Sequence, residues 1–209
     1  MADKSLSGGN PERGWGQMFP GFLTPDIHVD NRALNGRSTR SFRNEGHLEL
    51  VRKKLRKGDY VFIQFGHNDQ KADTARHSDA ETDYKINLGK YIDETRKVGA
   101  IPVLFTPIVR RKFNPNGTLA DTHGKYTDAV RTVAKEKQVL LIDLNKMSAG
   151  LLEKYGPEKS TSLFVWVEPG IYAALPKGKQ DNTHLNVRGA RLIARMVAEA
   201  IKETIPALA

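Results

Sequence analysis

A short element near the C-terminus, Asp181-Asn182-Thr183-His184, contains two residue types that work together in general-base catalysis. An imidazole acts as a base only when its orientation and tautomer are fixed, and a carboxylate three residues earlier can fold back to accept its other N–H. Asp181 and His184 are therefore candidates for orienting carboxylate and base. The alternative is that Asp181 and Asn182 form a turn that caps the next helix, and that His184 is a surface or core histidine.

Two further segments supply groups that can stabilise a negative charge. The apolar run Val61–Phe65 is too short for a helix and ends in Gly66-His67-Asn68-Asp69. A second predicted strand, Asp26–Leu34, runs into Asn35-Gly36-Arg37-Ser38. Because open α/β sheets place ligands at the carboxyl ends of their strands, the Gly36 N–H and the Asn68 amide are candidate donors to the oxyanion of an acyl-transfer reaction.

The elements that must position these groups alternate between strand and helix patterns. Strands are predicted at 26–34, 60–65, 101–106 and 139–143, and helices at 46–56, 81–98, 122–137, 145–155 and 186–204. This alternation predicts an α/β fold with a parallel sheet covered on both faces. The chain has 209 residues, 39% of them hydrophobic, and no internal repeat or linker-like segment, so one domain over residues 1–209 is expected.

These motifs, in this order, resemble the second, third and fifth sequence blocks of the SGNH (GDSL) hydrolases. The likeness extends to the branch that contains the rhamnogalacturonan acetylesterases, and it is carried by Pro11–Gln17, Asn31–Ser38, Gln64–Asp69 and Thr183–Asn186. It implies a flavodoxin-like three-layer α/β/α sandwich with a parallel sheet. It also implies that Gly36 and Asn68 are oxyanion donors, that His184 is the general base and that Asp181 orients it.

Neighbouring residues are predicted to contact substrate. They are Arg37, Ser38, His67, Asp69 and Trp166, the last of which lies in a loop-like segment before the Asp-x-x-His element, where sugar rings could stack on it. The alternative for Trp166 is that it closes the core over that loop.

The first block of the family, a Gly-Asp-Ser whose serine is the nucleophile, does not occur in the sequence. The resemblance implies that Met1 falls just after this block. We therefore expect an N-terminally truncated domain that lacks its central first strand and is inactive as given. Ser5 and Ser7 have no apolar strand before them to fix an Oγ, and Ser38 is more typical of a turn hydroxyl, so none is expected to substitute.

Charge and composition limit the other function classes. The formal net charge is +9, but the basic residues are mostly dispersed, so no nucleic-acid partner is expected. Arg110-Arg111-Lys112 is a different case, because it follows a strand and could meet a uronate-bearing polysaccharide, or else be an ordinary solubilising loop. The chain has no cysteine, and its His and Asp spacing matches no closed zinc motif, so no cofactor or metal is expected. Neither a membrane span nor a signal peptide is found, and the oligomeric state stays open.

The sequence thus predicts a carbohydrate O-acetylesterase of the Ser-His-Asp type that acts on acetylated pectin or rhamnogalacturonan, whether polysaccharide or oligosaccharide. Such substrates favour an extracytoplasmic location for the intact protein. Three alternatives stay open: a catalytically dead carbohydrate-binding protein that keeps the pocket, a lipase or thioesterase of the same family, and a basic nucleic-acid-binding domain.

Overall fold

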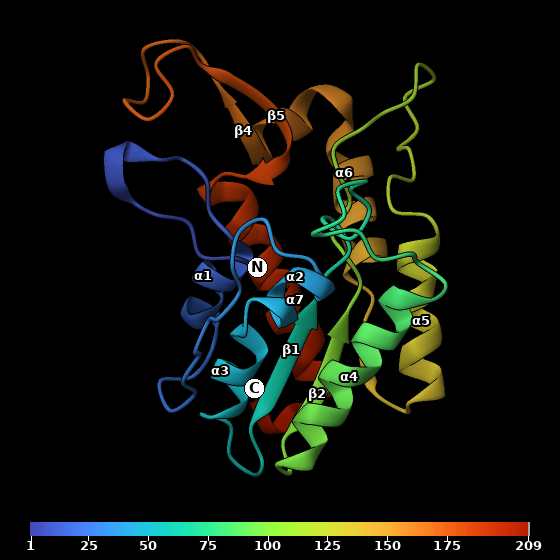
Figure 1. Ribbon diagram of the computed structural model, residues 1–209. Helices are drawn as coiled ribbons and strands as arrows, with labels where there is room; N and C mark the ends of the chain where they lie inside the picture. The colour runs from blue at the N-terminus through green and yellow to red at the C-terminus, as the bar shows by residue number, and fades with distance from the viewer. Residues whose placement is uncertain (209) are drawn as a thin grey trace. The chain divides into compact units, whose positions relative to one another are not determined.

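The computed structural model describes residues 1–208. They form two compact units that are interleaved along the chain. One unit contains Met1–Asn35, Val109–Thr122 and the chain from Lys146 onward, and the other contains Gly36–Ile108 and His123–Asn145. Figure 1 shows the helices and strands of both, most of them labelled. The dyad candidates Asp181 and His184 belong to the first unit, which we call the terminal unit, and Gly36 and Asn68 belong to the second, which we call the sheet unit.

The sheet unit is built on three parallel strands in the order β1-β2-β3. They are β1 (Tyr60–Gln64), β2 (Ile101–Phe105) and β3 (Leu140–Ile142). Val103 of the central strand lies opposite Phe62 on one side and Leu140 on the other, and it is fully buried. Runs of β-branched and aromatic residues suit strands buried on both faces. The predicted α/β fold with a parallel sheet is confirmed, and three of the four predicted strands are present.

Helices of the sheet unit supply the other side of its core (Figure 1). They are α2 (Thr39–Asn44), α3 (His47–Arg52), α4 (Asp83–Lys97) and α5 (Lys125–Glu136). Both α4 and α5 pack on β2. Tyr84, Leu88 and Ile92 recur at helical spacing along α4 and are almost completely buried. The predicted helices 81–98 and 122–137 are confirmed, and the predicted helix 46–56 is shorter.

The predicted strand Asp26–Leu34 is wrong, because these residues adopt no regular structure. A strand needs a partner for its backbone groups, and here other groups take that place. The Asn31 side chain donates from Nδ2 to the Met1 carbonyl oxygen at 3.2 Å and to Asp3 Oδ1 at 2.7 Å. The Ala33 N–H donates to Asn31 Oδ1, and the Ala33 carbonyl accepts from the Asp3 N–H. The segment is therefore held by local side-chain bonds and by the N-terminal residues rather than by a sheet.

The terminal unit consists of helices and one antiparallel hairpin. The helices are α1 (Trp15–Met18), α6 (Leu144–Lys159), which begins just before this unit, and α7 (Val187–Thr204). The hairpin pairs β4 (Phe164–Val167) with β5 (Lys179–Leu185). Short 3-10 turns lie at Ser7–Gly9, Phe19–Phe22, Ser160–Leu163 and Pro206–Leu208. The sequence did not reveal this hairpin, because β5 is mostly polar and lacks the alternation typical of a half-buried strand.

Helix α7 anchors the terminal unit. Its N-cap Asn186 accepts from the Gly189 N–H at 3.0 Å, and Ile193, Val197 and Ile201 form a buried stripe along one face. Helix α1 packs against α7. The end of β5 leads directly into this helix, so the position of His184 is fixed on its C-terminal side. Among the described residues, no helix combines the length and the apolar character that crossing a bilayer requires.

A pair of glycine substitutions tests this packing. A Cβ at Gly189 would overlap the carbonyl of Leu163, whereas a Cβ at Gly150 in α6 would meet nothing within 4 Å. We expect Gly189→Ala to lower the free energy of unfolding by about 1 to 3 kcal/mol through overpacking. Gly150→Ala should raise it by up to about 1 kcal/mol, because alanine favours the helix. Urea unfolding followed by circular dichroism measures both, and equal stability of Gly189→Ala and the unchanged chain would contradict the packing described.

Candidate active site

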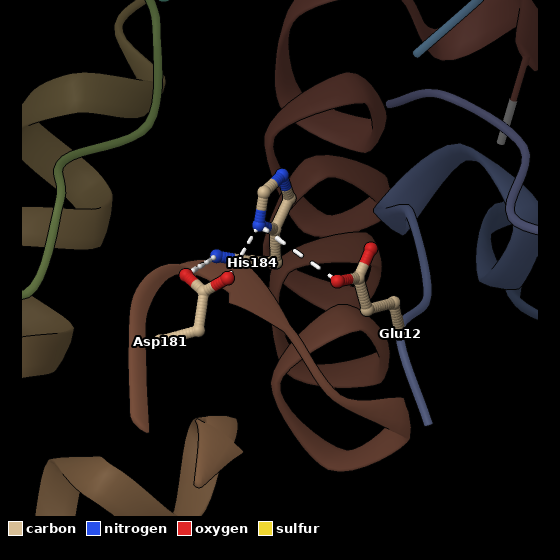
Figure 2. Close-up of side chains that lie close together, drawn as sticks. All are labelled: Glu12, Asp181 and His184. Atoms are coloured by element: carbon tan, nitrogen blue, oxygen red, sulfur yellow. Dashed lines mark hydrogen bonds and ion pairs between the residues drawn. The ribbon is translucent and has the colours of Figure 1, made fainter. Parts of the chain in front are cut away.

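The Asp-x-x-His element of β5 folds back on itself as the sequence predicts. The backbone N–H groups of Thr183 and His184 donate to Asp181 Oδ1 at 2.7 Å and 2.9 Å. The other carboxylate oxygen, Oδ2, lies 2.6 Å from His184 Nδ1 (Figure 2). One carboxylate therefore binds both the backbone and the ring of the same residue. Asn186 rather than Asp181 caps helix α7, so the capping alternative does not describe Asp181.

The geometry leaves the second ring nitrogen of His184 available. Because Nδ1 carries the proton donated to Asp181, Nε2 is the acceptor nitrogen in the neutral ring. Figure 2 shows Nε2 pointing away from the carboxylates. The His184 side chain is 39% exposed, so a hydroxyl group can reach it. This arrangement of an oriented imidazole with an open Nε2 is what a general base requires.

Asn182, in the middle of the element, is held by two residues from other segments. Arg111 donates from its backbone N–H to the Asn182 carbonyl at 2.8 Å and from its guanidinium to Oδ1 at 2.7 Å. The Trp166 indole N–H donates to the same Oδ1 at 3.0 Å, and the Arg111 guanidinium lies 4.8 Å from the Trp166 ring centroid. Arg111 also donates to the Pro157 carbonyl and to Ser160. Its cation is therefore engaged with protein groups, whereas Trp166 is 36% exposed.

A second carboxylate and an ammonium group, which the sequence did not single out, complete the cluster. Glu12 Oε1 lies 3.9 Å from His184 Nδ1 (Figure 2). The Lys179 ammonium bridges the two carboxylates, at 2.7 Å from Glu12 and 2.8 Å from Asp181. Glu12 reaches this place because its segment runs antiparallel to the end of β5, where the Arg13 N–H donates to the Leu185 carbonyl at 2.9 Å. The pairing joins residues far apart in sequence, so spacing alone could not have found it.

The electrostatics of the cluster keep both carboxylates ionised. Burial favours the neutral acid at Asp181, but hydrogen bonds from His184 and Lys179 outweigh burial and hold its pKa far below the usual value. At Glu12 burial acts the same way, and Lys179, His184 and Lys4 together lower the pKa. The pKa of Lys179 is raised, because its two carboxylate partners outweigh its own burial. The cluster therefore contains two anions and a bridging cation around one imidazole.

Ligand atoms of Glu12, Asp181 and His184 lie within 4.8 Å of one another, a spacing that a metal ion could use. The Lys179 ammonium, however, already binds both carboxylates, and the His184 Nδ1 is bound to Asp181. A divalent cation would have to displace the Lys179 ammonium from the carboxylates and the Nδ1 proton from His184. The contacts present are thus those of a network of hydrogen bonds and ion pairs.

In the sheet unit, the predicted oxyanion donors lie close to each other. The Asn68 side chain donates from Nδ2 to the Arg37 carbonyl at 3.1 Å, next to Gly36. Gly36 has φ of 77°, a left-handed conformation that favours glycine. The amide of Asn68 carries a second N–H besides the one that this bond uses. Arg37 itself pairs with Glu45 at 2.8 Å.

Two of the predicted substrate contacts are buried in the sheet unit. Ser38 is fully buried and caps α2, since its Oγ accepts from the Ser41 N–H at 3.1 Å. Asp69 is also fully buried, and it accepts from the Thr39 N–H and hydroxyl at 2.9 Å and 2.5 Å and from the Gly66 N–H at 3.1 Å. Burial raises the pKa of Asp69 despite these hydrogen bonds. Such contacts give both residues a structural role, and substrate contact by them stays a prediction.

The remaining sequence candidates occupy varied positions. His67 is half-buried, and its ring meets that of His123 edge-on, with centroids 4.4 Å apart. Ser5 and Ser7 are exposed, outside any strand, and their hydroxyl oxygens lie 2.7 Å from each other. Neither serine has the strand-end setting of an activated nucleophile. The hydroxyl of Ser38 is likewise taken by the helix cap.

Comparison with known proteins identifies the family. The model of the GDSL-like lipase/acylhydrolase family matches residues 2–192, which span both units. The chain belongs to the GDSL-like lipase/acylhydrolase family. The resemblance to this family, which we inferred from four short motifs, is thereby confirmed. The protein is therefore an ester hydrolase.

Two relatives are similar to this protein over nearly the whole chain. Rhamnogalacturonan acetylesterase RhgT from Bacillus subtilis (strain 168) is 42% identical, over 92% of this chain and 82% of its own length. A probable rhamnogalacturonan acetylesterase, YesY, from the same organism is 36% identical, over 91% of this chain and 83% of its own length.

Two solved structures agree with the fold. The crystal structure of protein YxiM from Bacillus subtilis, 30% identical, matches with a TM-score of 0.79 over 93% of this chain. The chain spans about half of that protein, 51% of its length. A catalytic mutant of the acetylxylan esterase Axe2 from Geobacillus stearothermophilus matches with a TM-score of 0.64 at 19% identity, over 96% of this chain and 84% of its own length. The latter likeness concerns the fold alone.

The lowered pKa of Asp181 predicts how its contribution to stability depends on pH. A carboxylate whose folded pKa lies below its unfolded pKa stabilises the fold above about pH 4, and this stabilisation is lost as the pH falls through the lower folded value. Asp181→Asn should therefore unfold more easily than the unchanged chain at pH 6. The difference should shrink as the pH falls below about 4. In that range the Asp181 side chain of the unfolded chain takes up a proton, so position 181 is then uncharged in the unfolded state of both proteins.

Urea unfolding of both proteins between pH 2 and pH 6 measures this difference. Taking the difference between two chains removes the opposite pH trend that the raised pKa of Asp69 adds to each. A stability difference that stays constant over the whole range would show that the charge of Asp181 does not matter to the fold.

Proposed function

We propose that this chain is the body of a carbohydrate O-acetylesterase that acts on acetylated pectin or rhamnogalacturonan. The observation that carries the proposal is the 2.6 Å contact between Asp181 and His184 Nδ1, with Nε2 left open, in a member of an acylhydrolase family. The names of the relatives RhgT and YesY support an acetylated rhamnogalacturonan as the substrate class. A polymer of this kind is met outside the cytoplasm, so we propose an extracytoplasmic location for the intact enzyme.

In the proposed reaction a serine hydroxyl attacks the acetyl carbonyl while His184 Nε2 takes the hydroxyl proton. Asp181 stabilises the imidazolium that forms. The negative charge on the carbonyl oxygen is held by N–H groups of Gly36, Asn68 and the nucleophile itself. His184 then gives its proton to the departing sugar hydroxyl, which leaves an acetyl-serine. Water attacks this ester by the same base catalysis, which releases acetate and restores the serine.

The nucleophile is the part of the proposal that the printed sequence does not supply. It contains no Gly-Asp-Ser, and Ser38 is committed to the cap of α2. We propose that the attacking serine belongs to a Gly-Asp-Ser segment outside the printed sequence, and that the chain as printed does not turn over esters. The same observation favours a second candidate, a carbohydrate-binding protein that has kept the dyad and lost the chemistry.

Acetate release from p-nitrophenyl acetate and from acetylated pectin tests the proposal. The chain as printed is compared with a chain extended at its N-terminus by a strand that ends in Gly-Asp-Ser, and with the same extension ending in Gly-Asp-Ala. Activity is expected only with the serine. His184→Ala in the active protein should lower kcat by at least about a hundredfold, as loss of a general base does. His28→Ala, an exposed histidine elsewhere in the terminal unit, is the matched control and should change little.

Each outcome decides between the candidates. Activity of the printed chain that depends on His184 would contradict the proposed external nucleophile and direct the search to Ser5, Ser7 or Ser38. Inactivity of every version, with acetylated pectin still bound, would favour the carbohydrate-binding protein. Hydrolysis of long-chain acyl esters or acyl thioesters in preference to acetylated pectin would favour a lipase or thioesterase.

A further inference from the structure

The Asp181 and His184 pair does not stand alone, because the second carboxylate faces the same ring nitrogen. Glu12 Oε1 and Asp181 Oδ2 lie 3.9 Å and 2.6 Å from His184 Nδ1 (Figure 2). Two anionic oxygens therefore face the same ring nitrogen. In most settings two carboxylates this close would also compete for a proton, which would remove one of the charges. A further group must therefore keep both ionised.

Lys179 is that group. Its ammonium lies between the carboxylates, 2.7 Å from Glu12 and 2.8 Å from Asp181. Glu12 Oε2 meets a second ammonium, Lys4, at 3.1 Å, and the side chains of Glu12 and Lys4 are only 14% and 9% exposed. In such partly dry surroundings charges interact more strongly than they do in water. Glu12 is thus a partly buried anion whose position is fixed by two cations, with its Oε1 also facing the imidazole.

We propose that Glu12 and Lys179 are positioning residues that act together on the Asp181 and His184 pair. Glu12 supplies a second negative charge that stabilises the imidazolium of His184. Lys179 holds both carboxylates in place and offsets part of their charge, so that the imidazole takes up a proton without retaining it. The role of His184 as a base rests on the proposed function, but the charge relation between these side chains does not.

Other charged groups near the cluster stay constant in the test. On the segment that carries Glu12, the guanidinium of Arg13 donates to the carbonyls of Asn10 and Glu12. On the other side, Arg111 binds Asn182. Lys4 reaches Glu12 from the N-terminal segment. These cations are present in every variant compared. Substitution of Glu12 or Lys179 therefore changes only the charges that face Asp181 and His184.

The test follows the imidazole resonances of His184 by NMR as the pH is varied, in the full chain as printed, with His184→Ala used for assignment. Glu12→Gln keeps an oxygen for Lys179 and removes the charge, so the titration midpoint of His184 should move to lower pH. Lys179→Met removes the cation, so the midpoint should move to higher pH. For Glu12→Gln, whose carboxylate lies 3.9 Å from His184 Nδ1, the shift should be roughly half a pH unit or more.

Further variants separate charge from structure. The double variant Glu12→Gln with Lys179→Met should return the midpoint towards that of the unchanged chain, and Lys179→Arg should keep it. Glu203→Gln, an exposed residue of α7, is the matched control and should leave it unmoved. A general loosening of the fold would move both single variants in the same direction, and that result would overturn the inference.

Unmoved midpoints in Glu12→Gln and in Lys179→Met would also overturn the inference, even if the extended chain hydrolyses acetyl esters. Conversely, failure of every chain to release acetate would count against the proposed function, but it would not affect the titration midpoints measured by NMR. Because the NMR readout needs no turnover, the two failures are distinguishable. If one single variant does not fold, the other still tests the inference, because each predicts a displacement of the midpoint on its own and Lys179→Arg serves as a control that should not move.

Discussion

The hydrogen bond between Asp181 and His184 depends on a constraint that lies largely in the backbone. Asp181 binds the N–H groups of the two residues that follow the turn, Thr183 and His184, before it binds the ring. The carboxylate is thereby oriented by its own strand, and the imidazole is aligned with it whichever substrate is present. Arg111 and Trp166 hold the Asn182 between them. In the proposed reaction, an imidazole held in this way needs no rearrangement before it accepts the proton.

The same cluster also joins the start of the chain to its end. Glu12 and Arg13 run beside the end of β5, and Lys179 closes the pair through two carboxylates. Buried ion pairs of this kind contribute little net stability unless each charge has several partners, because removing charges from water is costly. Here each carboxylate has several partners, so the charges are retained where an imidazole can use them. The role that we propose for this cluster beside the dyad is therefore one in function rather than in net stability.

Patterns in the sequence predicted the sheet unit well, because buried strands and amphipathic helices leave local periodic signals. Strands β1, β2 and β3 and helices α4 and α5 of this unit lie within a few residues of their predicted bounds, and so does α7 of the terminal unit. The strand predicted at 26–34 was wrong, because a strand forms only where a partner strand pairs with its backbone groups. Hairpin β4 and β5 was missed because polar residues fill β5. Asp181 and His184 were found because their bond is local, whereas Glu12 and Lys179 were not, because their contact spans 167 residues.

The central claim is that His184 activates a serine of a Gly-Asp-Ser segment and no serine of the printed chain. Covalent labelling with a fluorophosphonate, followed by mass spectrometry of the digested protein, tests it directly, since this reagent reacts with activated serines and requires no knowledge of the substrate. In the chain extended by Gly-Asp-Ser, the label should appear on that serine and disappear with His184→Ala, and the printed chain should stay unlabelled. A label on Ser5, Ser7 or Ser38 of the printed chain that depends on His184 would contradict the claim.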